Sequence, residues 1–138
     1  MTTFASESDV RGRLQAHDTE SVPTGLVTTA LEDAHDALLR RLDPQYAEPP
    51  AAPGLVIGEA LLAGAYLLRA LASRDAIEQQ RVTIGGQRIE AGDRFAALLA
   101  MADQSEKRAW RALEPFLLPM RPRVPLDVTA STPVLGQE

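Results

Sequence analysis

Several residue types are missing or scarce in this chain of 138 residues, and each shortage excludes a kind of chemistry. There is no cysteine, which excludes disulfide bonds, thiolate nucleophiles and cysteine-ligated zinc. Only two histidines are present, so few side chains are available for a metal site. Fourteen Lys and Arg against nineteen Asp and Glu give a net charge of −5, which is too acidic for a broad phosphate-binding surface. DNA binding is therefore not the first expectation.

Long hydrophobic runs are missing as well. The most apolar segment, 55–68, covers about 14 residues and contains Glu59, whereas a bilayer-spanning helix needs about 20 apolar residues. The amino terminus reaches Glu7 and Asp9 without the basic-then-apolar order of a secretory signal peptide. With 45% apolar and 24% charged residues, we expect one soluble globular domain with a modest core.

The hydrophobic periodicity predicts a mainly α-helical protein, organised as a small helical bundle. Ser6-Glu7-Ser8-Asp9 has the pattern of a capping box and predicts a short helix after it. Apolar residues at helical spacing predict three longer helices, over 24–42, 55–73 and 92–114. The proline-rich segment 44–53 is predicted to be a stiff connector.

The predicted helix 55–73 is apolar on nearly every face, which is typical of an element surrounded by other elements. Gly58, Ala60 and Gly64 would allow a neighbouring helix to approach it closely. We therefore expect this helix to be the central one.

A small β-hairpin is predicted near 80–90. The segments 81–84 and 87–89 flank Gly85-Gly86, a pair suited to the positive φ angles of a two-residue turn. A phosphate-binding loop is the weaker interpretation of the two glycines, because the Lys and Ser/Thr of a Walker motif do not follow them.

Beyond Pro115, prolines recur among apolar residues, a mixture that favours neither a helix nor full disorder. We therefore divide the chain into a helical domain, 1–117, and an extended proline-rich carboxyl-terminal arm, 118–138. Such an arm is typical of a segment that binds a partner. Trp110 is interpreted as a core residue, with an anchor at a partner surface as the alternative.

Candidate catalytic groups are few. Glu32, His35 and Asp36 lie three or four residues apart on a predicted helix and resemble one half of a carboxylate-bridged di-iron site. The second half is missing, so we interpret these residues as a solvated helix face. Glu59 could act as a buried general acid or base. We instead expect it near a helix amino terminus, or paired with an arginine such as Arg69 or Arg94.

The order of these segments resembles the head–tail connector, or adaptor, proteins of tailed bacteriophages and gene-transfer particles. The resemblance rests on FASESDVR at 4–11, a helix like 26–42 containing ALEDA, the helix GEALLAGAYLL at 58–68, the segment RVTIGG at 81–86, and a last helix. It covers about residues 4–117, and no single motif in it is diagnostic.

The resemblance implies a structural virion protein at the head–tail junction, or neck, made in the host cytoplasm. Such a protein forms a ring, usually a dodecamer, beneath the portal protein and contacts the next neck or tail protein, a stopper or tail terminator. Double-stranded DNA passes through the lumen without specific binding during packaging and ejection, and no catalysis, metal, cofactor or membrane is expected. By this resemblance, the residues that bind the portal or a neighbouring subunit are Phe116, Leu117, Leu118, Met120, Arg121, Arg123, Val124 and Leu126.

Two alternatives from other functional classes remain open at this point. The first is a small metal-dependent helical-bundle enzyme, which would use Glu32, His35, Asp36 and Glu59 and would retain iron or manganese. The second is a helical DNA-binding regulatory module with a basic patch, whose duplex affinity would fall steeply with salt. The residues of that patch would be Arg11, Arg13, Arg40 and Arg41.

Overall fold

The structure is a computed structural model that describes residues 2–81 and 88–119. Within these residues the chain forms mostly α-helix, which confirms the predicted mainly helical fold. In chain order the elements are α1 (Glu7–Leu14), α2 (Thr24–Leu39), the short 3-10 helix η1 (Pro44–Tyr46), α3 (Pro53–Arg81), α4 (Arg88–Leu113) and the 3-10 helix η3 (Glu114–Phe116).

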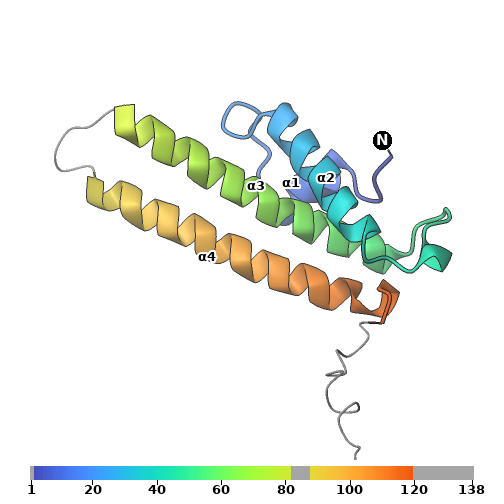
Figure 1. Ribbon diagram of the computed structural model, residues 1–138. Helices are drawn as coiled ribbons and strands as arrows, with labels where there is room; N and C mark the ends of the chain where they lie inside the picture. Colours follow the sequence, from blue (N-terminus) through green and yellow to red (C-terminus); the bar gives the residue numbers. More distant parts are fainter. Residues whose placement is uncertain (1, 82–87, 120–138) are drawn as a thin grey trace, which may run out of the picture.

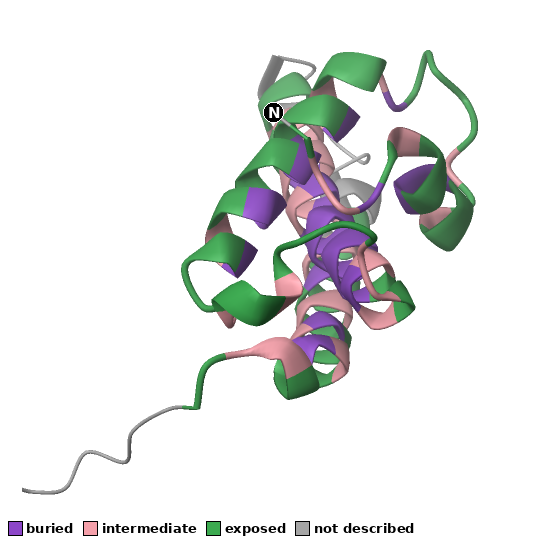
Figure 2. Cartoon of the chain, turned by 90° about the vertical axis from the view of Figure 1, so that its right-hand side faces the viewer, coloured by how far each residue is buried: buried purple, intermediate pink, exposed green. Residues whose placement is uncertain are grey.

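Helix α3 is the centre of the bundle, as its all-round apolar pattern predicts. α3 and α4 lie side by side as a long helical pair, and α1 and α2 pack on α3 (Figure 1). The buried positions concentrate on α3 and on the faces turned toward it (Figure 2). Leu55, Leu62 and Leu67 on this helix are fully buried, which places the hydrophobic core along its length.

By length and composition α3 could also cross a membrane, with a mean hydropathy of 1.7 over an apolar stretch within 53–78. In the structure 61% of that stretch is buried against the rest of the chain. A core helix of a soluble protein passes the same test, and this burial supports that interpretation.

The start of α1 is set by local hydrogen bonds, as the capping-box pattern predicts. The hydroxyl oxygen of Ser6 accepts a hydrogen bond from the Asp9 backbone N–H at 3.2 Å, and the Asp9 carboxylate accepts one from the Ser6 backbone N–H at 2.8 Å. Two backbone donors that a helix leaves unpaired at its first turn are thereby satisfied.

Helix α2 ends at Leu39, three residues before the predicted end. The next residues bond to the chain that follows α4 instead of extending the helix. The Asp43 backbone N–H donates to the Phe116 carbonyl at 2.9 Å, and the Leu118 N–H donates to the Arg41 carbonyl at 2.8 Å. Leu42 and Leu117 form an antiparallel bridge at the same place, so this contact closes one end of the bundle.

The predicted β-hairpin over 80–90 is not what the described residues form. α3 continues to Arg81 and α4 begins at Arg88, so the outer residues of both expected strands are helical. Residues 82–87, which include the two glycines, lie outside the described residues. The residues 78–81 are strong helix formers that extend an established helix, whereas an isolated two-stranded hairpin is only marginally stable.

Two glycines of α3 lie where neighbouring helices approach, as their spacing predicts. A Cβ atom added to Gly58 would overlap the side chain of Leu113 on α4. At Gly64 the added atom would lie 3.6 Å from Leu14 of α1, an ordinary contact distance. Gly58 is therefore the position where the packing of α3 against α4 requires glycine.

Candidate functional site

A buried pair of ionisable side chains, Glu59 and His35, lies in the middle of the bundle. Glu59 on α3 is fully buried, and His35 on α2 is 6% exposed. The His35 Nδ1 atom lies 3.2 Å from Glu59 Oε1. The backbone N–H of Phe4 also donates a hydrogen bond to Glu59 Oε2 at 3.0 Å. The carboxylate therefore joins α3, α2 and the amino-terminal segment.

The environment of Glu59 disfavours its charged form. Burial raises the pKa of Glu59 above its ordinary value, and the hydrogen bonds from His35 and from the backbone of Phe4 and Ala5 offset this effect only in part. A raised carboxyl pKa is a property that general acids share with structural buried carboxylates. The geometry around the pair decides between these two roles.

A cavity of about 510 Å³ opens next to His35. Its walls are mainly apolar and come from the amino-terminal segment, the end of α2 and the connection between α2 and α3. The Phe4 ring packs edge-on against the His35 ring, with centroids 4.9 Å apart. The residues that line the cavity are Thr2, Thr3, Phe4, His35, Leu39, Ala47, Pro49 and Ala51. The His35 imidazole therefore lies at the cavity wall, with the Glu59 carboxylate behind it. The described residues that line the cavity include no other ionisable side chain.

The two other members of the metal-site hypothesis point elsewhere. Glu32 and Asp36 are exposed on α2, whereas His35, close to them around the helix, is buried. Within residues 2–81 and 88–119, no group of three or more His, Asp or Glu side chains is placed to hold a metal ion. The prediction of a solvated face is correct for Glu32 and Asp36, whereas His35 belongs to the core.

The arginines expected to pair with Glu59 bind other carboxylates. Arg69 lies 2.6 Å from Glu106 and 3.0 Å from Asp103, both on α4. Arg94 lies 3.1 Å from Asp75. The predicted arginine partner for Glu59 is therefore wrong. His35, which the sequence predicts on a solvated face, takes its place.

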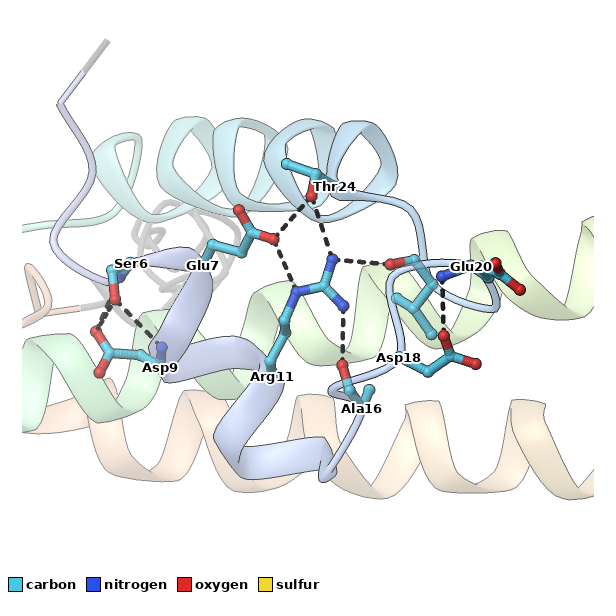
Figure 3. A network of polar contacts seen from close by, with 9 residues as sticks. Ser6, Glu7, Asp9, Arg11, Ala16, Asp18, Glu20 and Thr24 are labelled. Carbon is cyan, nitrogen blue, oxygen red and sulfur yellow. Dashed lines mark hydrogen bonds and ion pairs between the residues drawn. The ribbon is translucent and has the colours of Figure 1, made fainter.

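The basic patch of the DNA-binding alternative is incomplete. Arg11 is 7% exposed and acts as a clip between α1 and the start of α2 (Figure 3). Its guanidinium lies 2.7 Å from the Glu7 carboxylate and donates to the carbonyls of Ala16 and Val22 at 2.9 and 2.8 Å. Arg41 stacks on Trp110, with its Cζ atom 4.3 Å from the ring centre. Two of the four arginines therefore have structural roles.

Aromatic residues at and just after the end of α4 pack mostly within the chain itself. Trp110 is half-buried between core clusters, which agrees with its interpretation as a core residue. Phe116 packs on Tyr46, with ring centroids 5.1 Å apart, and Leu117 pairs with Leu42. Leu118 is the first residue of the expected partner-binding set that is largely exposed. The other members, Met120, Arg121, Arg123, Val124 and Leu126, lie outside the described residues.

Large apolar side chains remain exposed at both ends of the α3–α4 pair. Two exposed isoleucines mark the two ends of α3: Ile57 lies near its start and Ile77 near its end. They are 20 residues apart, which corresponds to about 30 Å along the helix. Leu39 and Leu118 lie at the end opposite Ile77, where residues 41–43 bond to 116–118. Large apolar side chains are therefore exposed at both ends of the described helical pair.

No family model, curated protein or solved structure matches this chain.

Proposed function

We propose that this protein is a head–tail adaptor, a structural virion protein that forms a ring beneath the portal and lets double-stranded DNA pass from head to tail. The observation that carries the proposal is the exposure of Ile77 at one end of the α3–α4 pair and of Leu39 and Leu118 at the other. A protomer with two different contact surfaces forms head-to-tail interfaces, and these close into a ring when the rotation between subunits closes.

The chain topology at the end of α4 supports the partner-binding role of the arm. The bridge between Leu42 and Leu117 completes the packing of the helical domain before the arm starts. Arm residues are therefore not needed to close the described core. The acidic balance of the chain also favours DNA passage, because a strongly basic lumen would hold the phosphates.

The first experiment measures the mass of the purified chain by light scattering, alone and after mixing with purified portal rings from tailed phages. Negative-stain images of the same fractions show whether rings form on the portals. The expected result is a ring of this chain on a portal. A chain that stays monomeric with every portal tested contradicts the adaptor proposal. Metal analysis of the same sample tests the enzyme alternative, which requires bound iron or manganese.

A truncation tests the role of the arm. Removal of residues 120–138 should leave a folded subunit, with unchanged helix content by circular dichroism, and should abolish portal binding. A finer test replaces Val124 and Leu126 by serine, and the matched control replaces Val134 and Leu135 by serine. We expect only the first pair to prevent binding. Normal portal binding by the truncated chain would exclude the arm as the portal contact.

A further inference from the structure

A groove between α1 and α4 runs along one side of α3. It has a volume of about 230 Å³ and an apolar floor formed by α3 residues such as Ala60 and Gly64. Met101, an exposed methionine, and Leu14 lie at its walls. Arg13 and Arg108 also line it, and neither takes part in an ion pair with another described residue. The groove therefore offers an apolar contact beside two cations without a carboxylate partner.

The outer face of α2 has the complementary character. Glu32, Asp36 and Leu39 lie at i, i+4 and i+7, so they form one stripe on the helix surface. All three are exposed, and neither carboxylate takes part in an ion pair within the described part of the chain. We name these three residues the α2 stripe. The subunit therefore has an acidic ridge with an apolar end, and a groove with basic side chains.

The α2 stripe and the groove lie on different sides of the subunit. The end of α2 reaches the Trp110 side of α4, because Arg41 stacks on that ring. Met101 precedes Trp110 by nine residues, which places it about 180° around α4. The groove is therefore on the opposite flank of α4 from the end of α2, and the α2 stripe cannot fill the groove of its own subunit.

From this complementarity we infer that the groove binds the α2 stripe of a second copy of this chain. The spacing of the side chains defines an antiparallel register for the two helices. Leu39 and Glu32 are seven residues apart on α2, and Met101 and Arg108 are seven residues apart on α4, so both pairs span about 10.5 Å. Leu39 packs on Met101, and Glu32 pairs with Arg108. Asp36 lies between them, where Arg13 supplies the second cation.

This contact is head-to-tail, since each subunit uses its α2 stripe on one neighbour and its groove on the other. The inference rests on the proposed function, because it names the subunit interface of the ring. The inferred interface also depends on the clip formed by Arg11. The clip fixes α1 against the start of α2, and α1 provides Arg13 and Leu14 to the groove wall.

Cysteine cross-linking tests the register directly, because the natural chain has no cysteine. The variant Leu39→Cys/Met101→Cys should form disulfide-linked dimers and larger ladders under mild oxidation. The matched control, Leu39→Cys/Glu20→Cys, pairs Leu39 with an exposed position that lies outside both the α2 stripe and the groove, and it should remain mostly uncrosslinked. Cross-linking captures weak association too, so the test does not require a stable ring in solution.

A charge exchange tests the Glu32–Arg108 pair. Glu32→Arg and Arg108→Glu should each weaken self-association at least about tenfold, because each places like charges together at the interface. An equimolar mixture of the two variants should restore association, since every contact between unlike subunits again joins opposite charges. The controls Glu20→Arg and Lys107→Glu change the net charge equally on exposed positions and should associate like the natural chain.

The outcomes separate this inference from the proposed function. Selective cross-links and rescue in the mixture support the interface. Rings that persist in both single charge variants overturn the interface but leave the adaptor proposal standing. A chain that gives neither cross-links nor rings, alone or with portals, overturns both.

Discussion

Replacement of the buried carboxylate of Glu59 gives a quantitative test of the bundle interior. Glu59→Ala leaves the Phe4 N–H and the His35 Nδ1 atom without their partner. Each buried polar group left unpaired costs about 1–3 kcal/mol, so two groups predict a loss of about 2–6 kcal/mol in the free energy of unfolding. Glu59→Gln keeps the shape and one acceptor oxygen, and we expect it to lose less than about 1.5 kcal/mol.

The difference in unfolding free energy between the natural chain and Glu59→Gln should change with pH in one direction. Burial raises the pKa of Glu59 above its ordinary value of 4.5, so the folded chain keeps this proton to a higher pH than the unfolded chain. Over that interval the folded state binds more protons, and the free energy of unfolding falls as pH rises. The contribution of Glu59 is complete below about pH 4.5 and is lost as pH rises through the raised pKa. Glu59→Gln cannot ionise and lacks this loss.

The assay is urea unfolding followed by circular dichroism, at several values between about pH 4 and pH 8. The natural chain should lose stability relative to Glu59→Gln as pH increases. A relative gain with increasing pH would refute the reasoning, since it would mean that the fold favours the carboxylate. Glu48→Gln, at an exposed position, controls for the loss of one negative charge. Repeating the comparison in a His35→Gln background removes the titratable side chain that contacts Glu59.

Two further predictions concern packing and stability. Arg11→Met should reduce the free energy of unfolding by about 3–5 kcal/mol, because it leaves buried partners of the guanidinium unpaired. The control Arg13→Met changes an exposed arginine and should alter this free energy by less than about 0.5 kcal/mol. Urea unfolding measures both values. Gly58→Ala should destabilise by about 1–3 kcal/mol through overlap with Leu113, whereas Gly64→Ala should be neutral or stabilising by up to about 1 kcal/mol, as measured by thermal melting. Equal effects of the two glycine substitutions would argue against close contact at Gly58.

Features encoded by neighbouring residues could be predicted from the sequence. The cap of α1 depends on Ser6 and Asp9, three residues apart, and the structure confirms it. The central position of α3 follows from its apolar residues on every side, because such a helix is stable in water only when others cover it. The start of α2 at Thr24 also agrees with the prediction, since Pro23 precedes the first helical turn.

The site could not be predicted, because its residues meet only after the helices pack. His35 and Glu59 are 24 residues apart, and the third contributor, the Phe4 backbone, is 55 residues from Glu59. One signal was available: His35 has the spacing of Leu31 and Leu38 on the buried face of α2, whereas Glu32 and Asp36 lie beside that face, on the exposed part of the helix. The metal-site motif places Glu32, His35 and Asp36 together because all three could bind a metal, and it does not separate the buried histidine from the exposed carboxylates.

The helix ends show how tertiary packing overrides local patterns. The apolar residue Leu42 extends the helical periodicity of α2, but its backbone is used for the bridge to Leu117. The β-branched residues after Arg81 favoured a hairpin, and the helical pair α3–α4 instead extends into both expected strands. At the end of α2, a contact between distant segments decides where the helix ends.

The bridge also relates the two proposed contacts to each other. It places Leu118, where the chain continues toward the proposed portal-binding arm, beside the end of α2 that carries Leu39. Rotational symmetry repeats every feature of a subunit on the same rim of a ring, so all arms would leave from one rim. Arms that each bind a portal weakly would then act together, because the first contact raises the effective concentration of the others. By this reasoning, a variant that blocks the α2 stripe should also weaken portal binding, although it leaves every arm residue unchanged.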